Sequence, residues 1–353
     1  MTGLFDPLQL GAIALPNRIV MAPMTRSRSD AQSVPTPIMV EYYRQRATAG
    51  LIVSEGIAPS RHGIGYCRTP GIYNAEQVAA WRQVTDAVHA AGGRIVAQLM
   101  HCGRIGARFN KAPDAETVAP SAVRAAGRIF TDVAGMQEQE VPRALATGEI
   151  AGVVEEYAAA TRHSLEAGFD GVELHCTSGY LPMQFMAVNS NQRTDAYGGT
   201  AENRTRFVVE TLEAMTGAAA GRVAMRICPG NPFNDVHDPD PTETYRALLS
   251  RIAHLGLAYL HVIRSPHRDL DAFALAREHF SGPLILNDGF DGASAARALA
   301  DGKGAAVSFA RHYIGNPDLA RRLREGLPLA GFDSKTIYTP GEAGYIDYPF
   351  AAS

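Results

Sequence analysis

The chain has 353 residues, of which 46% are hydrophobic and 20% are charged, and its formal net charge is −3. This composition is typical of a globular protein that is long enough to bury a core without disulfides or metal ions. It excludes a strongly basic surface, so we expect neither a nucleic-acid partner nor a membrane partner.

Residues 1–17 contain LFDPLQLGAIAL, which predicts a small hairpin that closes the bottom of the fold. Eight short apolar runs follow, each nearly continuous in β-branched and aliphatic residues. Such runs are typical of strands that are buried on both faces, as in a parallel sheet. The predicted strands span residues 18–24, 51–56, 94–100, 171–176, 222–229, 259–264, 283–288 and 305–310.

Helical patterns alternate with these strands, and the clearest one covers residues 75–91. Asn74 and Gln77 match a capping box there, and Gly92 is expected to end the helix. The other patterns span about 150–167, 203–217, 242–255, 268–280, 291–301 and 316–325. The alternation predicts an α/β fold, a closed (β/α)₈ TIM barrel. An open doubly wound sheet is the alternative, although no G-x-G-x-x-G motif follows an early strand.

Residues 111–148 interrupt this alternation, because GRIFTDVAG and its surroundings carry few helical signals. They predict a hairpin and an excursion over the top of the barrel, after the third strand. We therefore expect one domain over residues 1–353, with residues 111–148 inserted as a capping subdomain. The four cysteines form no C-x-x-C pair and no zinc spacing, and the N-terminus lacks the features of a signal peptide. These features predict reduced thiols, a cytoplasmic location and no metal site.

Side chains at the C-terminal ends of barrel strands line the active site in this architecture. Here they predict a polar ring over an apolar barrel interior, and no strand ends in the lysine of a Schiff-base aldolase. The strand-end residues are Pro23, Met24, Thr25, Glu55, Gly56, Gln98, His101, His175, Tyr180, Arg226, Asp288, Gly289, Ala310 and Arg311.

The loops after the seventh and eighth strands are where barrels often hold a phosphate. Asp288-Gly289 and Ala310-Arg311 occupy these loops, and Asn316 is expected to cap the helix that follows. An ordinary helix start beside a surface arginine is the alternative.

Across the barrel mouth, Thr25, Gln98 and Arg226 offer a hydroxyl, an amide and a guanidinium to the rim of a flat heterocycle. Each group alone is equally compatible with a structural role. Together with a phosphate site opposite, the three groups predict flavin mononucleotide (FMN).

Several long stretches of the chain are distinctive. They are RIVMAPMTRSRS (18–29), GRIVAQLMHCGR (93–104), SFARHYIGNPDLARRL (308–323), YTPGEAGYIDYP (338–349) and the long segment 168–207, which includes SNQRTDAYGG. In these stretches, and almost from end to end, the chain resembles the Old Yellow Enzyme family. The family implies a (β/α)₈ barrel that binds FMN without a covalent link. It also implies an enzyme that uses NADPH or NADH to reduce activated alkenes.

The resemblance assigns roles to the strand-end residues. Thr25 would bind the flavin C4 carbonyl, which places the chain in the branch with threonine at this position. Gln98 would contact the pyrimidine edge, and Arg226 would lie near N1 and the C2 carbonyl, where charge gathers on reduction. By the same resemblance, Pro23, Met24 and Gly56 would pack on the ring, while Asp288, Gly289, Ala310 and Arg311 would hold the phosphate. Asp288 and Ala310 stand where glycine is common in the family.

The same resemblance makes His175 and Tyr180 the catalytic pair. His175 would donate a hydrogen bond to the substrate's carbonyl or nitro oxygen, and Tyr180 would protonate the α-carbon. An aromatic lid on the barrel rim is the structural alternative for Tyr180.

At the second oxygen-binding position the family carries histidine or asparagine, whereas this chain carries Ser178. Three readings stay open: a hydroxyl that acts through a water, a turn residue without a catalytic part, or an engineered substitution. Met100 replaces a bulky tryptophan, and the expected substrate-shaping residues are Tyr66, Met100, Phe233 and Tyr338.

These observations predict an FMN-dependent ene-reductase that acts on small enone or nitro substrates, as a monomer or a weak homo-oligomer. Reduction of nitrate esters or nitroaromatics is the alternative within the family. A flavin-free barrel lyase or isomerase, and a flavin-binding protein without turnover, are the alternatives outside it.

Overall fold

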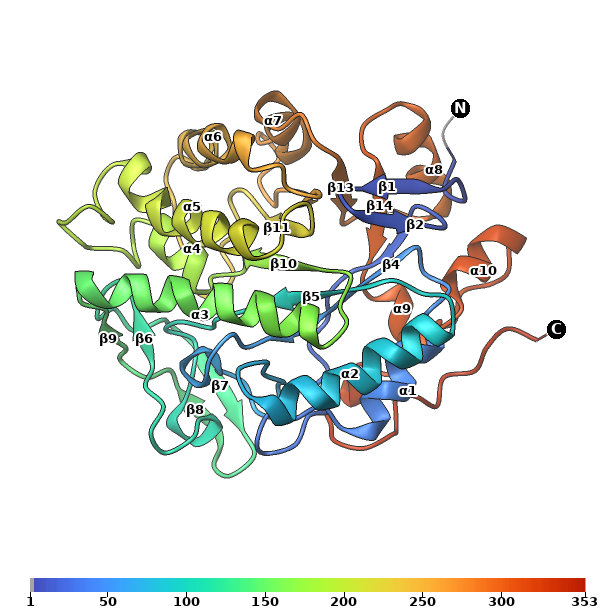
Figure 1. The fold of residues 1–353 in the computed structure, drawn as a ribbon, viewed down its shortest axis with the longest axis horizontal. Helices are drawn as coiled ribbons and strands as arrows, with labels where there is room; N and C mark the ends of the chain where they lie inside the picture. Colours follow the sequence, from blue (N-terminus) through green and yellow to red (C-terminus); the bar gives the residue numbers. More distant parts are fainter. Residues whose placement is uncertain (1–2, 353) are drawn as a thin grey trace.

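The computed structural model describes residues 3–352 (Figure 1). Eight parallel strands close into a barrel in the order β3-β4-β5-β10-β11-β12-β13-β14, which confirms the TIM barrel and excludes an open sheet. Every one of these strands lies within its predicted run or one residue beyond it. They are β3 (Ile19–Met21), β4 (Leu51–Ile57), β5 (Ile95–Leu99), β10 (Gly171–Cys176), β11 (Val223–Ile227), β12 (Leu260–Ile263), β13 (Leu284–Asn287) and β14 (Ala306–Phe309).

Helices surround the barrel, and the sequence did not predict three of them, α1, α4 and α9. The helices are α1 (Pro37–Gln45), α2 (Ala75–Ala90), α3 (Thr147–Glu166), α4 (Leu181–Met186), α5 (Ala201–Ala218), α6 (Pro241–Ile252), α7 (Ala272–His279), α8 (Gly292–Ala300), α9 (His312–Gly315) and α10 (Leu319–Glu325). Short 3₁₀ turns cover 61–63, 108–110, 253–255 and 334–336.

The predicted helix starts are confirmed in one case and wrong in another. Asn74 accepts a hydrogen bond from the backbone N–H of Gln77 at the start of α2, but the Gln77 side chain accepts from Tyr73, one residue before the capping-box position. Asn316 does not cap a helix start, because it directly follows α9, and α10 begins only at Leu319, after Asp318. Its amide instead binds the backbone of Ala330 in both directions and so fixes the chain that follows α10.

Two hairpins lie at opposite sides of the molecule (Figure 1). The expected N-terminal hairpin pairs β1 (Leu8–Leu10) with β2 (Ile13–Leu15), and the backbone N–H of Ala12 donates to Gly221 just before β11. The excursion after β5 contains the second hairpin, β7 (Arg128–Thr131) with β8 (Gly135–Glu138). It also pairs β6 (Val118–Ala119) with β9 (Arg143–Ala144). The boundaries 111–148 for a capping subdomain stay a prediction.

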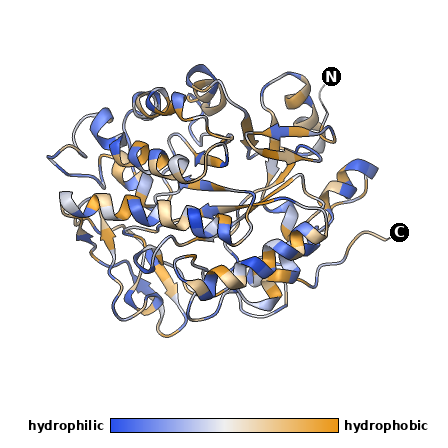
Figure 2. Cartoon of the chain, viewed as in Figure 1, coloured by the Kyte–Doolittle hydropathy of each residue, from blue (hydrophilic) through white to orange (hydrophobic). Residues whose placement is uncertain are grey.

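The core has two main parts, one between barrel and helices and one inside the barrel. Hydrophobic and hydrophilic residues alternate along the surrounding helices (Figure 2). The inner part is apolar toward the N-terminal hairpin, where Leu10 and Ile13 meet Val96, Ala224 and Ile285. Within residues 3–352, no helix combines the length and the apolar character that crossing a membrane requires.

The C-terminal tail returns to the loop after β3. Arg28 donates from Nη2 to the carbonyl oxygens of Thr336 and Ala343, and Arg26 donates from Nη2 to that of Gly344. Both arginines are at most 2% exposed. The tail therefore supplies the acceptors that these buried guanidinium groups need.

Candidate active site

His175 and Tyr180 lie together at the barrel mouth. His175 is the second-last residue of β10 and is paired in register with Arg226 of β11. Tyr180 immediately precedes α4. Their ring centroids are 5.1 Å apart at an interplanar angle of 44°. Each residue is 7% exposed, so the two groups share one small opening to solvent.

Tyr180 donates a hydrogen bond from its hydroxyl to that of Tyr66 over 3.2 Å. Burial raises the pKa of Tyr180 well above its usual range, and burial also raises the pKa of Tyr66 to about 12. An unperturbed tyrosine has a pKa of about 10 and already keeps its proton at neutral pH. The buried Tyr180 phenol is therefore protonated over a still wider range of pH.

The His175 imidazole is neutral at physiological pH. Burial, followed by the positive charge of Arg226, lowers its pKa to about 3. Its Nδ1 atom is buried and has no hydrogen-bond partner within residues 3–352. A neutral imidazole still carries one N–H donor. Because His175 stays neutral, its ring has this single donor throughout the physiological range of pH.

Ser178 lies in a left-handed turn with φ +59°, and Gly179 follows with φ +71°. The Ser178 carbonyl oxygen accepts a hydrogen bond from Nδ2 of Asn234 over 2.8 Å. Asparagine and histidine tolerate this backbone conformation better than most residues. The family's residues at this position therefore suit the turn as well as an oxygen-binding role.

Beneath the mouth, a buried hydrogen-bonded network joins the neighbouring strands β5 and β10 and continues to β12 and β14, which are not neighbours of β10. Gln98 of β5 donates from Nε2 to Oε1 of Glu173 on β10 over 2.8 Å. The other carboxylate oxygen lies 2.9 Å from Nδ1 of His261 on β12, and His261 Nε2 lies 2.7 Å from the hydroxyl of Ser308 on β14. The prediction of an apolar barrel interior is therefore wrong for this layer.

Arg226 joins the same network. Its Nη2 donates to Oδ1 of Asn287 over 2.7 Å, and its Nη1 lies 3.4 Å from both ring nitrogens of His261. Its Nε is buried without a partner among the described residues. Sequence analysis missed Glu173 and His261, although Glu173 lies two residues before His175 and so faces the same side of its strand.

The proposed phosphate end is more open. Asp288 and Gly289 are exposed and both adopt positive φ, at +76° and +74°. The conformation at Asp288 accounts for glycine being common there. Arg264 on the preceding loop donates weakly to the Asp288 carbonyl over 3.4 Å, and Arg311 is exposed at the start of α9. Sequence analysis did not single out Arg264.

The loop after β3 brings Pro23, Met24 and Thr25 to the mouth, and all three are partly exposed. Within residues 3–352, the Thr25 hydroxyl makes no protein hydrogen bond. Met100 is 3% exposed and lies against Gly56, where an added Cβ would be 2.5 Å from its sulfur. Met100 thus fills the space that a side chain at Gly56 would need.

The other expected substrate-shaping residues lie at the outer rim. Tyr66 is partly buried through its contact with Tyr180, whereas Phe233 is 57% exposed and Tyr338 is 61% exposed. The Tyr338 carbonyl accepts a hydrogen bond from Arg68 over 2.7 Å, which ties the tail to this rim.

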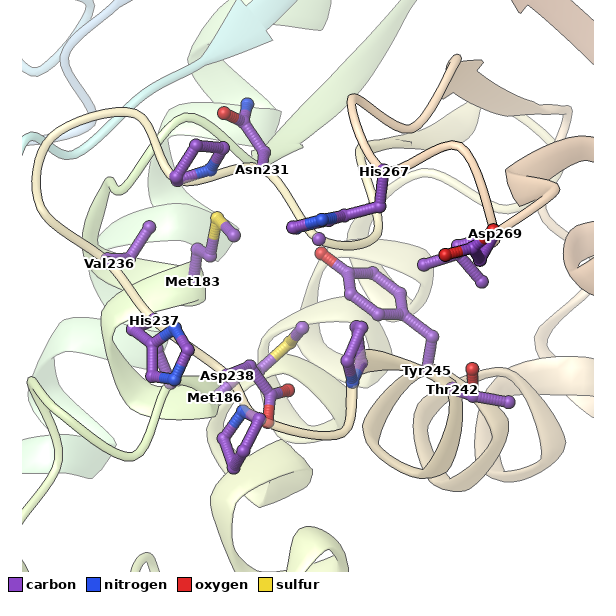
Figure 3. Close-up of a pocket in the computed structure, with 16 residues that line it drawn as sticks. Met183, Met186, Asn231, Val236, His237, Asp238, Thr242, Tyr245, His267 and Asp269 are labelled. Atoms are coloured by element: carbon purple, nitrogen blue, oxygen red, sulfur yellow. The ribbon is translucent and has the colours of Figure 1, made fainter.

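A cavity of about 380 Å³ lies outside the mouth, among α4, the loop after β11 and the start of α6 (Figure 3). Met183, Tyr245, Asp238 and His267 are among the residues that line it. None of the site residues predicted from the sequence lines this cavity.

The buried, unpartnered nitrogens of His175 and Arg226 are polar groups that a ligand at the mouth can satisfy. FMN offers carbonyl oxygens and ring nitrogens that match these donors. Barrel, mouth and donor set together define the class of flavin-dependent (β/α)₈ oxidoreductases.

Comparison with known proteins places the chain within this class. The chain belongs to the NADH:flavin oxidoreductase / NADH oxidase family, whose profile matches residues 3–330. It is therefore an FMN-dependent enzyme with NADH or NADPH as its reductant.

Several relatives match over nearly their whole length. A probable flavin mononucleotide-dependent alkene reductase from Leishmania infantum is 43% identical over 356 residues, which cover 98% of this chain and 97% of the relative. A 12-oxophytodienoate reductase from Oryza sativa is 38% identical, and the match covers 98% of this chain and 94% of the relative. Among solved structures, the Old Yellow Enzyme homologue from Zymomonas mobilis superposes with a TM-score of 0.94 at 39% identity, covering 98% and 99%. Morphinone reductase in complex with tetrahydroNAD superposes with a TM-score of 0.94 at 41% identity, and the match covers 100% of this chain and 98% of that structure.

Proposed function

We propose that this enzyme reduces the C=C bond of α,β-unsaturated carbonyl or nitro compounds. The observation that carries the proposal is a protonated, buried phenol 5.1 Å, centroid to centroid, from a neutral, buried imidazole at one opening. Alkene reduction needs a hydrogen-bond donor for the activating oxygen and a proton for the α-carbon. The reductases among the relatives support the same reaction class.

The catalytic residues divide this work. The N–H of His175 binds the carbonyl or nitro oxygen, on which negative charge develops as the β-carbon receives hydride. Tyr180 then gives its proton to the α-carbon, and Tyr66 accepts the hydrogen bond of Tyr180 between turnovers. The chemistry that FMN supplies when bound is hydride donation to the β-carbon.

Cofactor binding is assigned to the mouth residues. Thr25, Gln98 and Arg226 hold the polar edge of the flavin, and we assign the chain to the threonine branch of the family on the identity of Thr25. Residues 23, 24 and 56 pack on the ring, and residues 288, 289, 310 and 311 hold the phosphate. Unpartnered donors at His175 and Arg226, and the positive φ values at residues 288 and 289, support this placement.

The finer assignments follow from the rim. Tyr66, Met100, Phe233 and Tyr338 shape the substrate site, and Ser178 stands at the second oxygen-binding position. Within residues 3–352 the cysteines are free thiols, which supports a cytoplasmic location. We also propose that the enzyme is a monomer or a weak homo-oligomer.

Anaerobic titration tests the function. The purified enzyme is reduced with NADPH or NADH and then mixed with an enone, a maleimide, a nitroalkene, a nitrate ester or a nitroaromatic compound. We expect flavin absorbance to return with the enone and the nitroalkene, with the saturated product formed in equal amount. If only the nitrate ester and the nitroaromatic compound reoxidise the flavin, the proposed alkene reduction is wrong and the enzyme is a nitrate ester or nitroaromatic reductase.

A further inference from the structure

The buried network beneath the mouth contains one carboxylate, Glu173, and one guanidinium, Arg226, linked by His261. Glu173 and His261 are 0% exposed, so neither reaches the mouth itself. Glu173 instead contacts Gln98, and His261 contacts Arg226. The network therefore connects two fully buried groups with the two groups assigned to the flavin edge.

The hydrogen bonds fix the form of each group. An ionised carboxylate only accepts, so both Nε2 of Gln98 and Nδ1 of His261 must donate to Glu173. His261 is then neutral with its proton on Nδ1, and its Nε2 accepts from the Ser308 hydroxyl. Burial and the charge of Arg226 lower the pKa of His261 to about 4. The hydrogen bonds from His261 and Gln98, together with the charge of Arg226, hold the pKa of Glu173 below its usual value despite burial.

The barrel does not need this layer in order to pack. The layer below it is filled by Val96, Ala224, Ile285 and Ala306, which are all apolar and 0% exposed. Burying a charged pair is costly, and replacing such a pair by apolar residues is often neutral or stabilising. The charged layer therefore has a use other than filling the barrel.

We propose that Glu173 and His261 are positioning residues that set the reduction potential of bound FMN through Gln98 and Arg226. The Glu173 carboxylate balances the charge of Arg226 and orients the Gln98 amide, and the His261 ring holds the Arg226 guanidinium in place. Reduced flavin gathers negative charge, so a balanced pair beneath it stabilises the reduced form less than an isolated guanidinium does. The inference rests on the proposed placement of the flavin edge.

Glu173→Gln tests the inference, since it removes the charge and keeps the shape and hydrogen-bonding capacity. His261 adapts by moving its proton to Nε2, which then donates to Ser308. We expect the variant to bind reduced FMN about tenfold tighter relative to oxidised FMN, which raises the two-electron midpoint potential by about 30 mV. Glu210→Gln on α5 is the matched loss of one charge and leaves the potential unchanged; within residues 3–352 its carboxylate accepts a hydrogen bond only from Tyr197.

A potential that is equal in wild type and Glu173→Gln, with FMN bound in both, overturns the inference. The reduction potential and the FMN affinity are measured without any alkene. A lack of alkene reductase activity would therefore contradict the proposed function without changing the outcome of this test. A second measurement needs no variant and therefore tests the inference even if Glu173→Gln does not fold. In the wild-type holoenzyme labelled with ¹⁵N-histidine, NMR should show His261 as the neutral Nδ1–H tautomer from pH 5.5 to 8, whereas an Nε2–H tautomer overturns the inference.

Discussion

The Tyr180 hydroxyl donates its hydrogen bond to Tyr66 over 3.2 Å, and the two rings meet edge to face at 6.3 Å. Nδ2 of Asn234 lies 3.5 Å from the same Tyr66 oxygen. The proton that the proposed reaction needs therefore lies at the start of a short chain of polar groups, of which only Tyr180 is adjacent to His175.

Replacing Tyr180 by phenylalanine should lower kcat/KM for an enone by about 10²-fold or more, because the proton donor is lost. Reduction of the flavin by NADPH or NADH should keep its rate. Tyr66→Phe is the control, since it removes the acceptor and leaves the donor, and it should cost less than the Tyr180 variant. Stopped-flow measurement of both half-reactions checks the prediction, and an equal effect on both half-reactions would contradict the role as proton donor.

The rate of alkene reduction should show no ionisation of His175 between pH 5 and 8. Burial and Arg226 lower its pKa to about 3, so the ring is neutral throughout this range. The measurement is kcat/KM for the enone divided by the same quantity for His175→Asn, across that range of pH. A break in this ratio near the ordinary histidine value of about 6.5 would show that the ring titrates.

Glu55 should make the fold less stable as the pH rises. The carboxyl group lies between Tyr43 and the backbone of Arg26, and burial raises its pKa from 4.5 to about 7. Its contribution is complete below 4.5 and is lost as the pH rises through 7, by roughly 3 kcal/mol. Urea unfolding of wild type and Glu55→Gln should therefore show the variant gaining relative stability from pH 5 to 8. Glu76→Gln, an exposed change on α2, should not reproduce this trend.

Ser178→Asn should raise kcat/KM for cyclohexenone-type substrates. Asparagine restores a second donor for the substrate oxygen, and one such donor is typically worth about 10²-fold or more at an oxyanion. It also tolerates the φ of +59°, so the free energy of unfolding should not decrease. Ser178→Ala separates the readings, since it changes nothing if the serine is only a turn residue. An unchanged or lower value for Ser178→Asn means that another group already fills the second position.

Arg311→Ala should weaken FMN binding by about tenfold, because a charge-assisted hydrogen bond to phosphate is worth roughly 1.5–3 kcal/mol. Quenching of flavin fluorescence on titration into apoprotein measures this affinity. Riboflavin, which lacks the phosphate, should bind wild type and variant equally. Arg297→Ala removes an exposed arginine from α8 and should leave both affinities unchanged.

The sequence predicted the barrel closely because its strands are short, apolar and continuous. It missed α1, which begins at a proline, α4, a six-residue helix directly after Tyr180, and α9, a four-residue helix. Short helices that are held by tertiary packing carry little signal of their own.

The sequence also predicted that His175 and Tyr180 share the mouth, and the structure places them there. It did not predict the layer beneath, since Glu173 and His261 stand singly within apolar runs. The two-residue period of a strand would have placed Glu173 on the same side as His175. Which groups pair across the barrel depends on strand register, and no single strand contains that information.

The contacts of Arg26 and Arg28 with the tail join residues more than 300 positions apart. Protein synthesis runs from the N-terminus, so the carbonyl acceptors of these two guanidinium groups are made only when the polypeptide is almost complete. A ribosome-bound chain that stops before residue 336 leaves the loop carrying Thr25 without its support. Productive uptake of flavin should therefore begin only after the final segment has been released.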